Sequence, residues 1–330
     1  GRSAKAAVPA LEGLARGPDR DLSGRAVAAL GRIGGAESAH VLAGLLRSER
    51  GEMRFRASRG LARLDREHSL APLLEEATGD GPGRPEALRA LGDLYRPIPL
   101  LRDRGEVPRG VREVLFTGLA DSDPEIVGAA VFLAGSIREE KAMPHIVKVL
   151  KGDGQPALRA LAATALGWMG RKRACGDLID AMADPAEGVR AAAALSTGSL
   201  RCRGAGPMLL ALLEEKLDGA AGNAAWAIGR IGYRPATKAL RKGLAGGNAS
   251  SRANAALALA ELGDSRGAAL IRRRVGQEKS PVVKTALVDA LGRLGGAASL
   301  PLLRRLEASA DCRVVRNVAF LGPDGLQNAL

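Results

Sequence analysis

Three pairs of basic side chains recur near the C-terminal end of the sequence. Each pair directly follows two apolar residues, as in KALRKGLA at 238–245. The pairs are separated by 31 and then 32 residues, and their members are Arg241, Lys242, Arg272, Arg273, Arg304 and Arg305. Arginine suits carboxylates and phosphates because its planar fork donates two parallel hydrogen bonds. These six side chains, called the basic ridge below, are the candidate partner-binding residues.

Few other residues have the types and spacing of a catalytic or metal site. His40, His68 and His145 are far apart, and none has a second histidine at metal-binding spacing. The sequence contains no P-loop, no G-x-S-x-G and no H-E-x-x-H segment. We therefore predict no catalytic residue, no metal and no cofactor, and we favour a protein that is not an enzyme.

The three cysteines, Cys175, Cys202 and Cys312, are odd in number and lack C-x-x-C spacing. This pattern predicts neither a disulfide framework nor a zinc site, and it favours a reducing compartment such as the cytoplasm. Cys202 lies between two arginines, which favour a reactive thiolate. Two interpretations of Cys202 stay open: a reactive thiol, or a small residue in a turn between helices.

The composition favours stacked helices and acidic partners. Of the 330 residues, 46% are hydrophobic but only 2% are aromatic, so the core must consist of small and aliphatic side chains. The formal net charge is +13, and residues 217–330 contribute +9 of it, with 17 basic and 8 acidic residues. The apolar runs are too short and too often interrupted by arginine to predict a membrane span.

A period of about 31 residues organises the chain. The second residue of a recurring step similar to Leu-Gly marks it: Gly31, Ala62, Gly92, Ala134, Gly167, Gly198, Gly229, Ala260, Gly292, and Gly322 or Leu321. Each unit predicts an Ala-rich first helix, such as 250–263, and a second helix, such as 297–308. We interpret the periodic glycines as helix ends. Helix pairs of this size must stack to share a core.

Units such as PAEGVRAAAALSTG and SSRANAALALAELG resemble HEAT repeats, in particular the short bacterial repeats of phycobilin lyase subunits. A basic residue recurs at an equivalent place in the first helices: Arg54, Arg84, Arg159, Arg190, Arg252, Lys284 and Arg313. The resemblance implies an all-α, right-handed superhelical α-solenoid, armadillo-like, of about ten HEAT-like helix pairs. It also implies a protein-binding scaffold whose second helices line the concave side.

We expect residues 1–330 to form a single repeat array. An insertion at 95–110 contains prolines that forbid a regular helix, and it is interpreted either as a tolerated loop or as a binding edge. Both ends fall in mid-repeat, so we expect the chain to be part of a longer protein or a larger complex, and a preceding signal segment stays open.

The leading functional hypothesis is a non-enzymatic scaffold that binds an acidic protein on a concave basic face formed by the ridge. Two alternatives stay open. The ridge could bind a nucleic-acid backbone without sequence specificity, which would make affinity fall steeply with salt. The chain could also be a lyase or chaperone-type subunit acting on a bound protein, which would need a reactive thiol such as Cys202 or a partner subunit.

Overall fold

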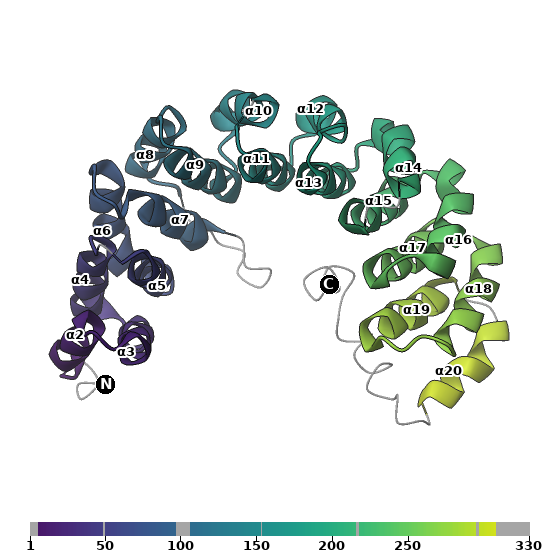
Figure 1. Cartoon of the computed structure of the whole chain (residues 1–330), viewed down its shortest axis with the longest axis horizontal. Coiled ribbons are helices and arrows are strands. Elements are labelled where there is room, and N and C mark those ends of the chain that lie inside the picture. The colour runs from purple at the N-terminus through teal and green to yellow at the C-terminus, as the bar shows by residue number, and fades with distance from the viewer. Residues whose placement is uncertain are drawn as a thin grey trace. The chain divides into compact units, whose positions relative to one another are not determined.

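The computed structural model describes residues 6–48, 50–96, 106–152, 154–215, 218–294 and 297–307. Over these ranges the chain forms nineteen α-helices and five short 3-10 helices, and no strand (Figure 1). This confirms the predicted all-α solenoid of helix pairs. The chain divides into two compact units, unit 1 from Gly1 to Val149 and unit 2 from Leu150 to Leu330. The boundary lies inside α10, not at the 95–110 insertion.

Unit 1 alternates second and first helices of the repeat. The second helices are α2 (Val8–Arg16), α4 (Gly35–Leu46), α6 (Arg66–Thr78), α8 (Arg109–Leu119) and, after η1 (Glu140–Ala142), α10 (Met143–Lys151). The first helices are α3 (Arg20–Ile33), α5 (Gly51–Leu61), α7 (Arg84–Tyr95) and α9 (Pro124–Ile137). Turn residues fix their starts: Asp123, for example, accepts a hydrogen bond from the Glu125 backbone N–H as the N-cap of α9.

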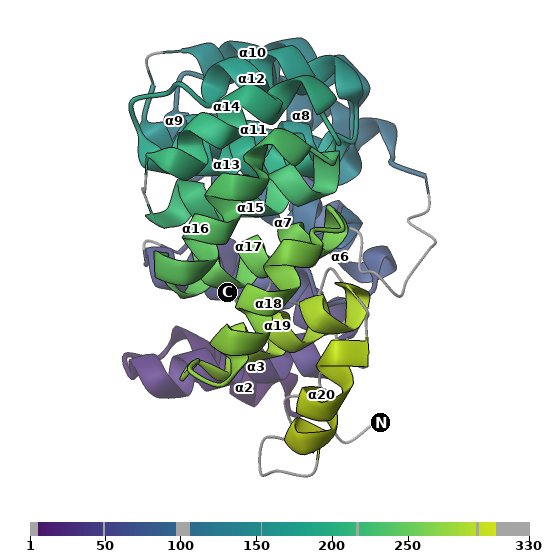
Figure 2. The same ribbon diagram turned by 90° about the vertical axis from the view of Figure 1, so that its right-hand side faces the viewer.

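Unit 2 continues the same alternation. Its first helices are α11 (Pro156–Met169), α13 (Glu187–Ser199), α15 (Asp218–Ile231), α17 (Ala249–Glu261) and α19 (Pro281–Leu294). Its second helices are α12 (Cys175–Ala181), α14 (Gly206–Glu214), α16 (Thr237–Gly246), α18 (Ser265–Val275) and α20 (Leu300–Glu307), which follow one another in Figure 2. All but α18 follow a 3-10 turn: η2 (Lys172–Ala174), η3 (Arg203–Ala205), η4 (Arg234–Ala236) and η5 (Ala297–Ser299).

The periodic glycines at 31, 92, 167, 198 and 229 are contact points between first helices. A Cβ added at Gly198 would lie 2.8 Å from the Ala227 Cα, and one at Gly229 would lie 2.8 Å from the Ala258 Cα. The interpretation of these residues as helix ends is therefore wrong for the marker position itself. It holds for glycines a few residues later, such as Gly170 and Gly232, whose φ angles of 73° and 75° suit glycine at a helix end.

This close approach places the first helices on the inner side of unit 2. Figure 1 shows α11, α13, α15, α17 and α19 on the inside of the curved stack, with α12, α14, α16 and α18 outside them. The prediction that the second helices line the concave side is wrong for this unit. The physical reason is that a row of Gly- and Ala-rich helices packs at short spacing, so it forms the shorter, inner row.

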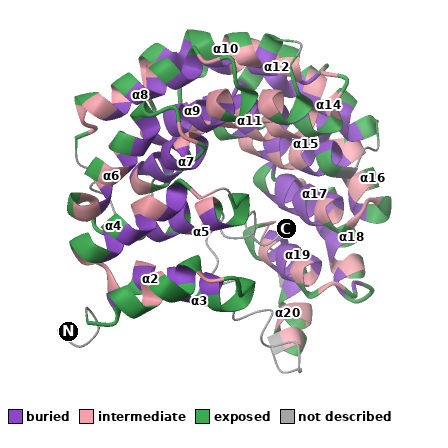
Figure 3. Ribbon diagram, turned by 60° about the vertical axis from the view of Figure 1, so that its left-hand side comes forward, coloured by how far each residue is buried: buried purple, intermediate pink, exposed green. Residues whose placement is uncertain are grey.

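The core lies between the two rows and is aliphatic. Leu166, Ile228, Leu240, Ile271 and Leu287 are fully buried in unit 2. Figure 3 shows the contrast between the rows: most of α17 is buried, whereas α16 buries only the side that faces the core. Leucine and alanine fill the space between closely packed helices, which explains the low aromatic content.

Several sequence predictions concern residues outside the described ranges. Residues 97–105 of the 95–110 insertion are among them; on either side, α7 ends at Tyr95 and α8 begins at Arg109. Cys312, Arg313 and the last marker position also lie outside. Among the described helices, none combines the length and apolar character needed to cross a membrane.

Candidate partner-binding surface

The recurring basic residue of the first helices takes part in ion pairs between neighbouring repeats. The Arg159 guanidinium donates to both carboxylate oxygens of Asp184, at 2.7 and 2.9 Å. Arg252 does the same to Glu278, at 2.8 and 2.9 Å. In unit 1, Arg84 pairs with Asp121 at 2.7 Å. The arginine side chains are only 12–17% exposed, so this position serves to join repeats rather than to face a partner.

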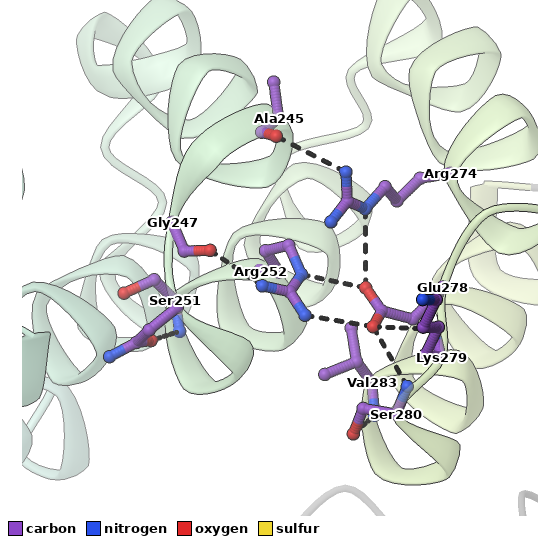
Figure 4. Close-up of polar contacts among 10 residues, drawn as sticks. Ala245, Gly247, Ser251, Arg252, Arg274, Glu278, Lys279, Ser280 and Val283 are labelled. Carbon is purple, nitrogen blue, oxygen red and sulfur yellow. Dashed lines mark hydrogen bonds and ion pairs between the residues drawn. The ribbon is translucent and has the colours of Figure 1, made fainter.

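The Arg252–Glu278 pair shows how such a joint is built (Figure 4). Arg252 also donates to the Gly247 carbonyl at 2.8 Å, so one side chain ties the turn before α17 to the turn before α19. The Glu278 side chain is 3% exposed and also accepts hydrogen bonds from the backbone N–H groups of Lys279 and Ser280 and from Arg274. The Arg252 hydrogen bonds, aided by the Ser280 backbone, outweigh desolvation and lower the pKa of Glu278 to about 2.

The six ridge residues lie on three successive second helices of unit 2. Arg241 and Lys242 belong to α16, Arg272 and Arg273 to α18, and Arg304 and Arg305 to α20. The structure thus places them on the outer row. Whether they bind a partner stays a prediction.

Arg241 differs from the other five. Its guanidinium donates to both carboxylate oxygens of Asp264, each at 2.7 Å, and its side chain is 27% exposed. Asp264 is the N-cap of α18 and also accepts from the Gly267 N–H at 2.9 Å. The Arg241 hydrogen bonds lower the pKa of Asp264. Arg241 therefore holds α16 against the start of α18, and its charge is neutralised there.

The remaining ridge residues have no acidic partner among the described side chains. Lys242, Arg273, Arg304 and Arg305 are exposed, and Arg272 is partly buried with its Nη1 atom 3.5 Å from the Ser299 Oγ. The acidic side chains described between 237 and 307 are each committed to an arginine elsewhere. The pairs are Asp264 with Arg241, Glu278 with Arg252, and Glu261 and Asp289 with Arg293. The outer row of unit 2 thus carries uncompensated positive charge over three repeats.

The sequence profile described as HEAT repeats matches residues 7–92, 112–197 and 237–322. The chain belongs to the HEAT-repeat family. The predicted resemblance to this family is confirmed. The sequence has no match among curated proteins.

Solved structures agree with this HEAT-repeat fold. Kap95, in its complex with Nup1, is 14% identical with a TM-score of 0.66; the match covers 93% of this chain and 47% of Kap95, about half its length. YibA of Escherichia coli is 17% identical with a TM-score of 0.55, covering 85% of this chain and 98% of YibA. A chain from the CpcE–CpcF complex of phycocyanin lyase from Nostoc sp. PCC7120 is 22% identical, and the match covers 68% of this chain and 99% of that chain; its TM-score of 0.49 is too low to support the fold. At these identities the likeness shows the fold alone.

Two cysteines of this HEAT array form a disulfide. Cys175, at the start of α12, is bonded to Cys202, directly before η3, with the Cα atoms 5.7 Å apart. The prediction of no disulfide is wrong, and Cys202, 3% exposed, is not a free reactive thiol. The separation of 27 residues was the missed signal, because a spacing slightly shorter than one repeat joins neighbouring turns. The argument for a reducing compartment loses its basis.

The histidines lie in three different repeats of the array, as the sequence suggests. His145 meets the Phe116 ring edge to face, with centroids 5.9 Å apart. No group of three His, Cys, Asp or Glu side chains within the described ranges has the arrangement of a metal site.

Proposed function

We propose that this HEAT-repeat chain is a non-enzymatic scaffold that binds an acidic protein surface through the basic ridge of α16, α18 and α20. One observation carries the proposal. The exposed side chains of Lys242, Arg273, Arg304 and Arg305 lie on successive repeats and have no acidic partner among the described residues. The described carboxylates near them are all paired with other arginines. Cations placed one repeat apart attract a partner that presents carboxylates over a similar length.

The remaining two ridge residues have supporting roles. Arg272 adds partly buried charge to the middle of the ridge, and Arg241 fixes the position of α18 through Asp264. The neighbour Kap95, which was solved in a complex with Nup1, illustrates that a stack of this fold can hold a protein partner. Since Cys202 is bonded to Cys175, a lyase mechanism through this thiol is not supported.

The proposal is tested with a fluorescein-labelled oligoglutamate peptide and fluorescence anisotropy. A ridge variant changes Lys242, Arg273, Arg304 and Arg305 to glutamine. We expect the parent protein to bind the peptide with an affinity that falls steeply as salt is added. The ridge variant should bind the peptide about tenfold more weakly, or weaker still. Circular dichroism checks that the helices persist, because exposed substitutions change stability little.

A matched control removes the same number of charges from unit 1, by changing Arg20, Arg25, Arg32 and Arg109 to glutamine; all four are exposed. If this control loses as much affinity as the ridge variant, only the net charge of +13 matters and the ridge is not a site. Duplex DNA is the competitor. If it binds more tightly than oligoglutamate and depends on the same ridge residues, the backbone-binding alternative replaces the scaffold proposal.

A further inference from the structure

A groove of about 320 Å³ lies beside the ridge, between α16 and α18. Its apolar part is formed by Leu244, Ala245 and Leu270, and its polar part includes Arg273, Arg274 and Gln277. Ligand pockets span about 300–1,000 Å³, so this groove accommodates a few side chains of an extended segment rather than a folded domain.

Leu270 gives the groove an unusual apolar wall. The sequence pattern predicts that both apolar residues before each basic pair point inward. Ile271 does so and is fully buried, but Leu270 is 39% exposed. At the equivalent pair of α16, Leu240 is fully buried and Ala239 is a small residue. An exposed leucine that lines a groove is available for contact with a partner.

The charge of the groove is positive after its internal ion pairs are counted. Arg241 is neutralised by Asp264, and Arg252 by Glu278 (Figure 4). Arg274 reaches the same Glu278 carboxylate at 3.4 Å and the Ala245 carbonyl at 3.5 Å, and its side chain is 28% exposed. Because Glu278 already compensates Arg252, the charge of Arg274 remains in excess.

Arg273 adds a second excess charge. It is exposed and has no ion pair with any described residue. Arg273 and Arg274 therefore add net positive charge to the lining of the groove, next to its apolar residues, and Arg274 is held in place by its bonds to Glu278 and Ala245. A guanidinium that is already positioned loses less conformational freedom when it binds a carboxylate.

We propose that this groove receives an apolar side chain of an acidic protein segment, while Arg273 and Arg274 bind carboxylates on either side of it. The inference rests on the proposed function and specifies the partner: a segment of Asp and Glu residues interrupted by a large aliphatic residue. A phosphate backbone would satisfy the arginines but would leave Leu270 without an apolar contact. A purely acidic peptide would also pair with the arginines and leave Leu270 without an apolar contact.

Two labelled peptides test the inference: oligoglutamate, and the same peptide with one central leucine. Burial of a leucine side chain contributes enough free energy for about a tenfold gain in affinity. We expect the parent protein to bind the leucine peptide about tenfold more tightly. Leu270→Ser should abolish this preference while leaving the affinity for oligoglutamate unchanged, and Arg273→Gln should weaken the binding of both peptides.

Leu300→Ser is the matched control, since Leu300 is a leucine on α20 that is 50% exposed and does not line the groove. It should retain the preference for the leucine peptide. Both leucines are exposed, so both variants should fold, and their thermal midpoints verify this.

The outcomes separate this inference from the proposed function. If both peptides bind equally and the ridge variant weakens both, the groove inference is overturned and the scaffold proposal stands. If Leu300→Ser abolishes the preference as fully as Leu270→Ser, the groove is not the site and the inference is again overturned. If neither peptide binds the parent protein, both proposals fail. A preference lost only with Leu270→Ser supports the groove as the binding site.

Discussion

Arginines at two places in the repeat have opposite surroundings. Arg252, at the start of a first helix, is 17% exposed and binds both oxygens of a carboxylate in the turn before the next first helix. Arg273, near the end of a second helix, is exposed and has no acidic partner in the described part of the chain. Both are equally basic, so the place in the repeat decides whether an arginine joins repeats or is available to a partner.

The same contrast holds within one dipeptide. Arg241 is paired with Asp264, whereas Lys242, the next residue, is exposed and unpaired among the described residues. Successive residues of a helix point about 100° apart, so one reaches the neighbouring turn and the other faces solvent. The two members of a basic pair in the sequence therefore have different surroundings in the folded chain.

The largest expected effect is on the joint between α17 and α19. Arg252→Met leaves the Glu278 carboxylate buried with less compensation, so we expect the free energy of unfolding to fall by about 3–5 kcal/mol. Urea denaturation followed by circular dichroism measures it. Lys242→Met is the matched control and should change stability by less than about 0.5 kcal/mol. If both variants lost the same free energy of unfolding, Arg252 would be no more important for joining repeats than the ridge residue Lys242.

A covalent joint should have the next largest effect. Changing Cys175 and Cys202 to serine opens a loop with a sequence separation of 27 and should lower stability by about 3 kcal/mol. Thermal unfolding with and without a reductant measures it. The parent should lose stability on reduction and the double variant should not; a parent that is insensitive to reductant would contradict a structural role for the disulfide.

Acid should weaken the ion pairs that join neighbouring repeats and should leave the charges of the basic ridge unchanged. The pKa of Glu278 is lowered from 4.5 to about 2 in the folded chain, so its contribution is present above the unfolded pKa and is lost as pH falls through the folded one. For this group alone, we expect a loss of about 2 kcal/mol between about pH 5 and about pH 3. Denaturation at several pH values measures it.

Glu278→Gln supplies the control for this pH dependence and should show a shallower slope over the same range. The ridge variant should show the parent slope, because lysine and arginine do not titrate there. A Glu278→Gln variant with the parent slope would assign the acid sensitivity to other carboxylates, such as Asp184 and Asp264, whose pKa values are also lowered by their arginines.

The smallest effect on stability concerns the adjacent residues of α16. Arg241→Gln should cost about 1 kcal/mol, because the ion pair is partly exposed and Asp264 keeps its bond to the Gly267 N–H. Lys242→Gln should leave stability unchanged but weaken oligoglutamate binding severalfold. Urea denaturation and fluorescence anisotropy of the two variants measure both quantities. If Arg241→Gln weakened binding more than Lys242→Gln without destabilising the chain, Arg241 would belong to the binding surface instead.

The period of about 31 residues, the two helices of each repeat, the HEAT resemblance and the positions of the basic residues can all be read from the amino-acid sequence. These follow from local spacing, since apolar periodicity and turn residues act over a few neighbours. Packing between repeats sets which arginines are paired, because Asp184 and Glu278 lie 25 and 26 residues beyond Arg159 and Arg252. The same packing brings Cys175 and Cys202 together, leaves Leu270 exposed and puts the first helices of unit 2 on its inner side. Each of these depends on how one repeat packs against the next, and the spacing of residues within a repeat does not specify that packing.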